Sequence, residues 1–380
     1  MVHKMKAFWS GLLCIAVLAA ILAGCAGSAD PSSSANSSGS SAGQSSADSS
    51  DSAPSESSAL LSSETSDAAN ETGSVEYPIV IQHAFGETVI ESKPDRVATI
   101  QWGNQDVVLA LGVVPVGFSA ANYGVEDDSG LLPWTKDRLT ELGEENPNVF
   151  QDTDGLDFEA ISDCKPDVIL AAYSGITQED YDILTQIAPV VAYQTTPWMT
   201  QWRELVTYTA LGMGMPQEGE QLIADTEALI AEKTAAYPQI AGKTVTWVNF
   251  NATDLSKLHI YTPEDPRGAF LYELGLTYPQ SVIDAIDDPE SYSASFSAEN
   301  AAPLHEADIL VGYGTEDVLE AVKADQVLGK IPAVQKGAVV VIPGNTSLGA
   351  AGNPNPLSIE HTIDEYLALI VEALDKSDAE

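Results

Sequence analysis

Positively charged side chains are scarce in this chain of 380 residues, which has 16 lysines and arginines against 56 aspartates and glutamates. The formal net charge at pH 7 is −40. Proteins bind nucleic acid through basic patches that neutralise its phosphates. The charge balance therefore excludes nucleic acid as an expected partner.

Cysteine is also scarce, with three in the chain. Cys14 and Cys25 lie within the first 25 residues, so Cys164 has no disulfide partner in the remainder. We expect Cys164 to pack as a small apolar side chain rather than to react. Stability must then come from packing alone.

The motifs of common enzyme classes are absent. The sequence contains no G-x-x-x-x-G-K-[ST] phosphate loop, no G-x-S-x-G nucleophile elbow and no H-E-x-x-H metal helix. His83, His259, His305 and His361 lie too far apart in sequence to show metal-ligand spacing. We predict no catalytic residue and no protein-bound metal. The alternative from the enzyme class is an exported hydrolase acting on the cell envelope.

The apolar run near the N-terminus, residues 11–22, is shorter than the about 20 residues that cross a bilayer. Two lysines precede it and small residues follow, as in a cleavable export signal. The end of the run, Leu22-Ala23-Gly24-Cys25, resembles the bacterial lipobox. We predict a signal peptide over residues 1–25 and lipidation of Cys25, which would hold the protein on a membrane. A single transmembrane anchor is the alternative.

Residues 26–75 are rich in serine, alanine and aspartate and contain no lysine or arginine. Such a segment cannot bury a core. As a flexible coil of about fifty residues it would span about 35 to 40 Å. We predict a disordered tether, whose length favours a Gram-positive plasma membrane over an outer membrane.

Strands and helices alternate in the rest of the chain, which predicts an α/β fold with ligands at the carboxyl ends of parallel strands. The predicted strands are 97–101, 113–118, 167–172, 190–193, 243–250, 308–313 and 338–342. The predicted helices are 104–111, 178–187, 217–237, 266–274 and one that starts at residue 358.

The length of this part, some three hundred residues, exceeds what one core usually covers and indicates two lobes. The helix over 217–237 lies between two similar halves and would act as a rigid strut of about 30 Å. We predict an N-terminal lobe over 76–200, a connecting helical segment over 201–240 and a C-terminal lobe over 241–380. A ligand cleft is expected between the lobes.

An internal repeat supports this division. Residues 158–173 and 298–313 align without a gap, and each copy has a glutamate fourteen residues before a tyrosine at the end of a strand. These pairs are Glu159 with Tyr173 and Glu299 with Tyr313. The alternative is that both copies follow the general βαβ pattern.

Several motifs together resemble those of one protein family. They are His-Ala-Phe-Gly-Glu-Thr at 83–88, Lys-Pro-Asp-Arg-Val at 93–97, Leu-Gly-Val-Val-Pro-Val-Gly at 111–117 and Lys-Pro-Asp-Val-Ile-Leu at 165–170. The sequence is similar to the substrate-binding lipoproteins of bacterial ATP-driven iron-siderophore importers, which are grouped with cobalamin and haem binders. The resemblance implies two Rossmann-like lobes joined by a single long rigid helix, with the ligand cleft between the lobes.

Aromatic and polar residues follow the predicted strand ends and form the candidate ligand site. They are Trp102, Asn104, Tyr173, Trp198, Phe250, Tyr261 and Tyr313. Rigid aromatic walls with a few polar groups suit a large amphipathic ligand, although each ring could equally cap a core.

Arg267, one of only four arginines, lies near the start of a predicted helix on the same side. The resemblance implies that such an arginine donates to oxygen atoms around chelated iron, a role that suits the guanidinium fork. A single basic group favours a neutral or cationic hydroxamate complex over an anionic tris-catecholate. Iron would be held only by the siderophore, so no cofactor is expected.

The resemblance also implies that Glu159 and Glu299 contact the dimeric permease, while stabilising helix starts is the alternative role. We therefore expect a monomeric, lipid-anchored receptor that captures a ferric siderophore and delivers it to an ABC permease with its ATPase. The same fold loaded with cobalamin or haem is the alternative, because the tyrosines leave an axial haem ligand possible.

Overall fold

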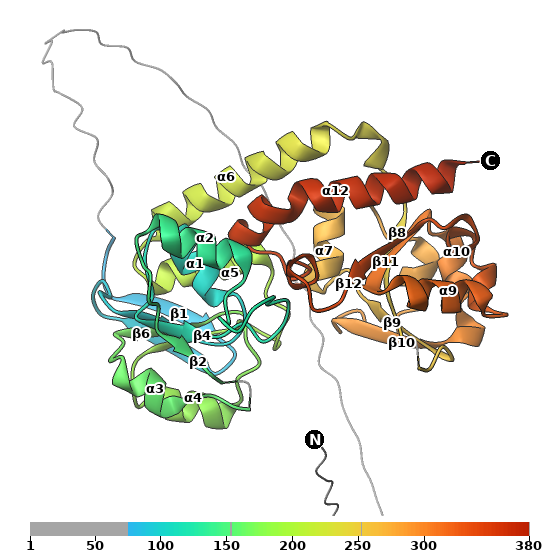
Figure 1. The fold of residues 1–380 in the computed structure, drawn as a ribbon. Coiled ribbons are helices and arrows are strands. Elements are labelled where there is room, and N and C mark those ends of the chain that lie inside the picture. Colours follow the sequence, from blue (N-terminus) through green and yellow to red (C-terminus); the bar gives the residue numbers. More distant parts are fainter. Residues whose placement is uncertain (1–74, 153, 252, 380) are drawn as a thin grey trace, which may run out of the picture. The chain divides into compact units, whose positions relative to one another are not determined.

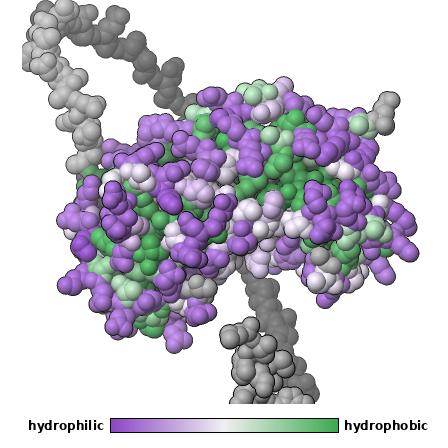
Figure 2. All heavy atoms as spheres, in the orientation of Figure 1, coloured by the Kyte–Doolittle hydropathy of each residue, from purple (hydrophilic) through white to green (hydrophobic). Residues whose placement is uncertain are grey.

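The computed structural model describes residues 75–152, 154–251 and 253–379, which belong to one compact unit. The predicted signal peptide, Cys25 and nearly all of the predicted tether lie outside the described residues. Within the described ranges no helix is both long and apolar enough to cross a membrane. The face drawn in Figure 2 is covered mostly by hydrophilic side chains.

The first of two five-stranded sheets is entirely parallel and has the order β5-β4-β3-β6-β7. Its strands are Val97–Thr99 (β3), Gly117–Ser119 (β4), Val149–Phe150 (β5), Val168–Ala171 (β6) and Val190–Ala192 (β7). The central strands β3, β4 and β6 are buried throughout, including the polar residues Thr99 and Ser119, because helices cover both faces of the sheet.

Helices and a hairpin surround this sheet (Figure 1). The helices are Asn104–Ala110 (α1), Pro133–Glu141 (α2), Phe158–Asp163 (α3), Gln178–Leu184 (α4) and Trp202–Gly212 (α5). The antiparallel hairpin is Ile79–His83 (β1) with Gly86–Ile90 (β2). It is fixed to the first sheet where the Thr88 hydroxyl donates to the Val190 carbonyl at 2.6 Å.

The second sheet is mixed and has the order β10-β9-β8-β11-β12. Its strands are Val245–Phe250 (β8), Lys257–Tyr261 (β9), Ser293–Ser297 (β10), Ile309–Gly314 (β11) and Val339–Pro343 (β12). Strand β11 is parallel to both β8 and β12, whereas β9 is antiparallel to β8 and β10. The predicted α/β fold with two sheet-bearing lobes is confirmed.

Short helices accompany the second sheet. The α-helices are Pro266–Glu273 (α7), Gln280–Ile283 (α8), Glu316–Ala324 (α9), Pro332–Lys336 (α10) and Ser347–Ala350 (α11). The 3₁₀ turns are Pro238–Ile240, Ala298–Asn300, Ala302–Glu306 and Leu328–Lys330.

Two long helices link the halves. Helix α6, Pro216–Ala235, follows the first sheet, and α12, Pro356–Asp378, ends the described chain. They pack side by side, and α12 also contacts α1 and α2 of the first half. Lys233 on α6 pairs with Asp364 on α12 at 2.6 Å. The long connecting helix predicted between the lobes is therefore α6, and α12 packs along it.

The repeat corresponds to equivalent parts of the two sheets. Strand β6 lies between β3 and β7, and β11 lies between β8 and β12, at the same place in the strand order. Each is preceded by short helical turns, α3 in one half and the turns over 298–306 in the other.

Some predicted elements differ from the structure. The strand predicted over 113–118 is wrong for its first part, because β4 starts at Gly117 and Pro115 lacks a backbone N–H. The segment 201–240 contains α5 as well as α6. The terminal helix starts at Pro356 rather than Ser358, because Asn355 caps it: its Oδ1 accepts from the Ser358 backbone N–H at 3.0 Å.

Candidate functional site

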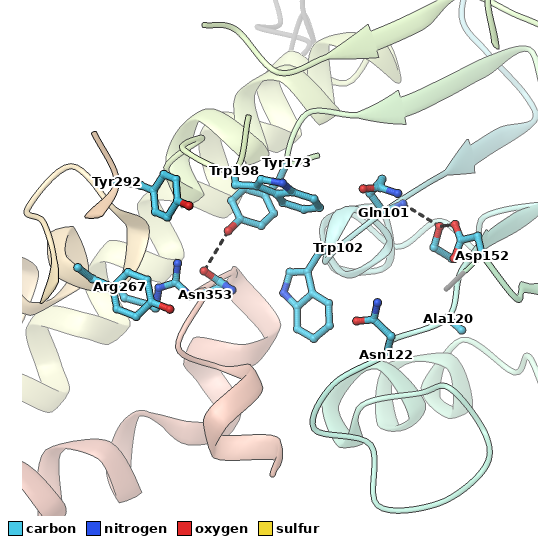
Figure 3. Close-up of a pocket in the computed structure, with 12 residues that line it drawn as sticks. Gln101, Trp102, Ala120, Asn122, Asp152, Tyr173, Trp198, Arg267, Tyr292 and Asn353 are labelled. Carbon is cyan, nitrogen blue, oxygen red and sulfur yellow. Dashed lines mark hydrogen bonds between the residues drawn. The ribbon is translucent and has the colours of Figure 1, made fainter. Parts of the chain in front are cut away.

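A cavity of about 320 Å³ lies between residues of the two halves (Figure 3). The first half contributes residues that end or follow β3 to β7, and the second contributes the end of β9, the start of α7 and residues just before β10 and α12. The lining residues are Gln101, Trp102, Ser119, Ala120, Asn122, Asp152, Tyr173, Trp198, Tyr261, Arg267, Tyr292 and Asn353. The cavity brings together five of the eight residues predicted for the ligand site.

Trp198 and Tyr173 form an aromatic wall, with their rings edge-to-face and the centroids 5.4 Å apart. The Trp198 backbone has a φ of 64° and is held where its N–H donates to the Ser174 carbonyl at 3.1 Å. Gly175 leaves room for the indole, since a Cβ there would lie 2.3 Å from Trp198 Nε1. With 38% of its surface exposed, Trp198 is available to a ligand.

Asn104 supports this wall from behind and does not line the cavity. It is fully buried, its Nδ2 donates to the Ile100 and Tyr173 carbonyls, and its Oδ1 accepts from the Tyr173 N–H. The prediction that Asn104 contacts the ligand is therefore corrected. Its amide is fully engaged in joining the ends of β3 and β6.

Phe250 and Tyr313 also lie outside the set of lining residues, and the reason for Phe250 is strand direction. Because β9 runs antiparallel to β8, the lining residue Tyr261 lies opposite Trp247, whereas Phe250 lies opposite Leu258. The prediction placed every strand-end aromatic on one edge, which holds only for parallel strands.

Tyr313 supports the same loop that reaches the cavity. Its hydroxyl donates to the Gly349 carbonyl at 3.1 Å, and the Tyr173 hydroxyl donates to Asn353 Oδ1 at 3.0 Å. The two tyrosines of the repeat therefore converge on residues 349–353. Burial raises the pKa of both phenols, so they stay neutral.

Arg267 is paired with a buried carboxylate. Its Nε and Nη2 donate to the two oxygens of Asp265 at 2.7 and 2.6 Å, and its Cζ lies 3.7 Å from the centroid of the Tyr261 ring. Burial opposes the charge, but the hydrogen bonds and charge of Asp265 more than offset it and raise the pKa of Arg267. The guanidinium is thus permanently charged, fixed in direction and electrically compensated.

A second polar group lies where β3, β4 and β5 end. The Gln101 backbone N–H donates to Ser119 Oγ at 2.7 Å, and this hydroxyl donates to Asp152 Oδ2 at 2.5 Å. Gln101 has a φ of 65°, a conformation that non-glycine residues rarely adopt. Burial raises the pKa of Asp152 from its ordinary value.

Sequence reasoning missed the polar lining residues. Gln101 and Asp152 follow strand ends, but β5 has only two residues and gives no periodic signal. Asn353 lies in the Gly-Asn-Pro-Asn-Pro segment before α12, which reads only as a turn. Within the described residues, no group of three or more His, Cys, Asp and Glu side chains is arranged to hold a metal ion.

Glu159 and Glu299, the predicted docking residues, are both exposed in the first turn of short helical segments. The oxygen that caps α3 belongs to Asp157, which accepts from the Ala160 N–H at 2.9 Å. The turn that holds Glu299 has no side-chain cap. Neither glutamate is needed as a hydrogen-bonding cap.

The chain is similar to known binding proteins. The periplasmic binding protein family model matches residues 97–346. The probable siderophore-binding lipoprotein YfiY of Bacillus subtilis (strain 168) is 28% identical over 256 residues, or 67% of this chain and 73% of the relative. The Fe(3+) dicitrate-binding periplasmic protein FecB of Escherichia coli (strain K12) is 24% identical over 282 residues, or 70% and 86%.

Two solved structures are also similar to this chain. Streptococcus pneumoniae TIGR4 PiaA, crystallised in complex with ferrichrome, is 51% identical, covers 78% of this chain and 99% of its own, and has a TM-score of 0.75. Staphylococcus aureus SirA, complexed with staphyloferrin B, is 22% identical over 78% of this chain and 98% of its own; its TM-score of 0.58 shows the shared fold. The chain therefore belongs to the periplasmic binding protein family, whose members are binding proteins and not enzymes.

Proposed function

We propose that this chain is an extracytoplasmic receptor that captures a ferric siderophore of the hydroxamate type and delivers it to the permease of an ABC importer. The proposal is supported by the similarity to PiaA, whose crystal structure contains ferrichrome, and to a probable siderophore-binding lipoprotein. Iron enters as part of this ligand and not as a cofactor of the protein.

The observation that carries the proposal is the combination of aromatic rings with Arg267 around one cavity. Trp102, Tyr173, Trp198, Tyr261 and Tyr292 offer flat apolar surface to the organic shell of a chelate. Arg267 offers donors to oxygen atoms around the iron. A ferric hydroxamate complex presents both of these surfaces, an organic shell and oxygen atoms around the iron.

The charge of the cavity favours a neutral or cationic complex. Among the described lining residues, Arg267 is the only cation, and Asp265 compensates it. A tris-catecholate complex carries several negative charges, which would find no uncompensated cation in this lining. The free energy needed to desolvate such a ligand would exceed the electrostatic free energy gained in the cavity.

A fluorescence titration tests the ligand class, with Trp102 and Trp198 as reporters. We expect a ferric hydroxamate such as ferrichrome to quench the emission with a dissociation constant of about 1 μM or below, which is about −8 kcal/mol or better. Ferric tris-catecholate, cobalamin and haem form the comparison panel. Saturable quenching by cobalamin or haem alone would overturn the iron assignment.

Delivery is assigned to Glu159 and Glu299, which are exposed at matching positions of the repeat. Two acids on related lobes can each meet one subunit of a dimeric permease, so both contacts form in one docking event. A lipid on Cys25 would keep the monomeric receptor near that permease, most simply at a Gram-positive plasma membrane. Radiolabelled palmitate incorporation that is lost in Cys25→Ala tests the anchor.

A further inference from the structure

One charged group of the cavity lining has no counter-ion. Among the described residues that line the cavity, only Asp152 and Arg267 are charged. The positive charge of Arg267 is compensated by the carboxylate of Asp265, which is fully buried. Asp152 has no ion pair with any described residue, so its carboxylate is the uncompensated charge of the lining.

The position of this carboxylate is fixed by a directional chain of hydrogen bonds. Ser119 Oγ accepts from the Gln101 N–H, and its own hydrogen is directed to Asp152 Oδ2. Oδ1 receives no hydrogen bond from any other residue that the structure describes. Because the hydroxyl hydrogen is already committed, Asp152 is arranged as an acceptor with one oxygen available to a ligand.

The two charged positions lie at opposite ends of the cavity. Figure 3 shows Asp152 at one end and Arg267 at the other, with Trp102, Tyr173 and Trp198 between them. The Asp152 end is built from the ends of β3, β4 and β5, whereas Arg267 belongs to α7. A ligand that fills the cavity therefore meets donors at one end and an acceptor at the other.

We propose that Asp152 binds a positively charged amine of the ligand, so that the cavity selects ferric hydroxamates that carry an ammonium group. This inference rests on the proposed function and names the substrate class more closely. An ammonium at Oδ1 forms a charge-assisted hydrogen bond with a partly desolvated carboxylate, where solvent and salt screen it less than on the surface. The raised pKa of Asp152 reports the same desolvation.

A matched pair of probes tests the proposal: ferrioxamine B, a linear ferric trihydroxamate with a terminal ammonium, and its N-acetylated form, which differs by that charge. Calorimetric titration of the purified protein should show about tenfold or tighter binding of the ammonium form. Asp152→Asn should remove this preference while leaving the affinity for the acetylated form within about threefold. Asn retains an oxygen for the Ser119 hydroxyl, so the fold is preserved.

Asp154→Asn is the control, because it removes the same charge from an exposed position two residues away. It should keep the preference for the ammonium form. Equal affinity of the wild type for both probes, a preference that survives in Asp152→Asn, or binding of ferrichrome with no response to either ferrioxamine would overturn this inference alone. Failure to bind every ferric hydroxamate, ferrichrome included, would overturn the proposed function itself.

Discussion

Arg267 and Asp265 form an ion pair in which the arginine side chain is 14% exposed and the aspartate is fully buried. From the sequence, an arginine at this position reads as a free surface donor whose removal would hardly affect stability. The partner changes that expectation. Removing the guanidinium leaves a buried carboxylate without its counter-ion, which is costly.

Arg267→Ala should therefore lower the free energy of unfolding by about 3 kcal/mol as well as weaken ligand binding. Chemical denaturation measures the first effect. Lys323→Ala is the control, because Lys323 forms an exposed pair with Glu320 and should change stability by less than about 1 kcal/mol. Equal stability of Arg267→Ala and the wild type would show that the pair contributes nothing to the fold.

Asp106, fully buried on α1, provides a pH-dependent test. It accepts from Trp134 Nε1 at 2.8 Å, Thr135 Oγ1 at 2.6 Å and Asn355 Nδ2 at 2.9 Å, yet burial outweighs these bonds and raises its pKa from 3.8 to about 6. The folded state thus holds this proton more tightly than the unfolded state. The contribution of Asp106 to stability therefore falls as pH rises from about 4 through 6.

The stability of the wild type relative to Asp106→Asn should increase by up to about 3 kcal/mol as pH is lowered from 7 to 4, because a shift of two pKa units is worth that much. Urea unfolding of both proteins across this range measures it. Asp154 is exposed, so the stability of the wild type relative to Asp154→Asn should not increase in this way as pH is lowered. A difference that is constant with pH would mean that Asp106 is already protonated, or already ionised, throughout.

At the scale of elements, the loop before α12 joins the two halves. Asn355 caps α12 through Oδ1 and donates through Nδ2 to Asp106 on α1, while Asn353, two residues earlier, lines the cavity. Asn355→Ala removes both bonds. We expect a loss of about 2 kcal/mol, at the upper end for a helix cap, because a buried carboxylate also loses a donor.

Thr315→Ala is the matched control for that measurement, since Thr315 stands at the N-cap of α9 without a side-chain cap bond. Thermal unfolding should distinguish the two variants by several degrees in Tm. If Asn355→Ala and Thr315→Ala have the same Tm, the loop before α12 is not held by the two Asn355 hydrogen bonds.

The sequence predicts elements well where apolar runs are long, as in β6, β8 and β11. It fails where the element is short or paired antiparallel, as in the two-residue β5 and in β9 with β10. The candidate site follows the same rule. Trp102, Tyr173 and Trp198 are found because they follow parallel strands, whereas Asn353 and Tyr292 reach the cavity from loops with no periodic signal.

At the scale of the whole molecule, the repeat places one exposed glutamate at equivalent positions of the two halves. We expect Glu159→Ala and Glu299→Ala to leave ligand affinity intact, to reduce iron uptake singly and to nearly abolish it together. Uptake of ⁵⁵Fe-loaded ferrichrome by complemented cells measures this. Glu179→Ala and Glu316→Ala, which change other exposed first-turn acids, form the control.

Full uptake by the double variant would refute the docking role. Reduced uptake accompanied by weaker ferrichrome binding in the purified variants would contradict it as well, because the two glutamates would then act through the ligand site. The combination of intact binding and lost uptake is specific to docking.

The ferrichrome affinity of the wild type, measured beside that of Trp198→Ala, tests the proposed receptor function most directly. Trp198 is 38% exposed in the cavity wall, so its removal should spare the fold but lose about 1 to 2 kcal/mol of aromatic contact, or about tenfold in affinity. Tyr272→Ala, an exposed aromatic outside the cavity lining, should bind as the wild type does. We expect one saturable site with a Kd of about 1 μM or below, and weaker binding only in Trp198→Ala. Absence of saturable binding, or equal affinity in all three proteins, would contradict it.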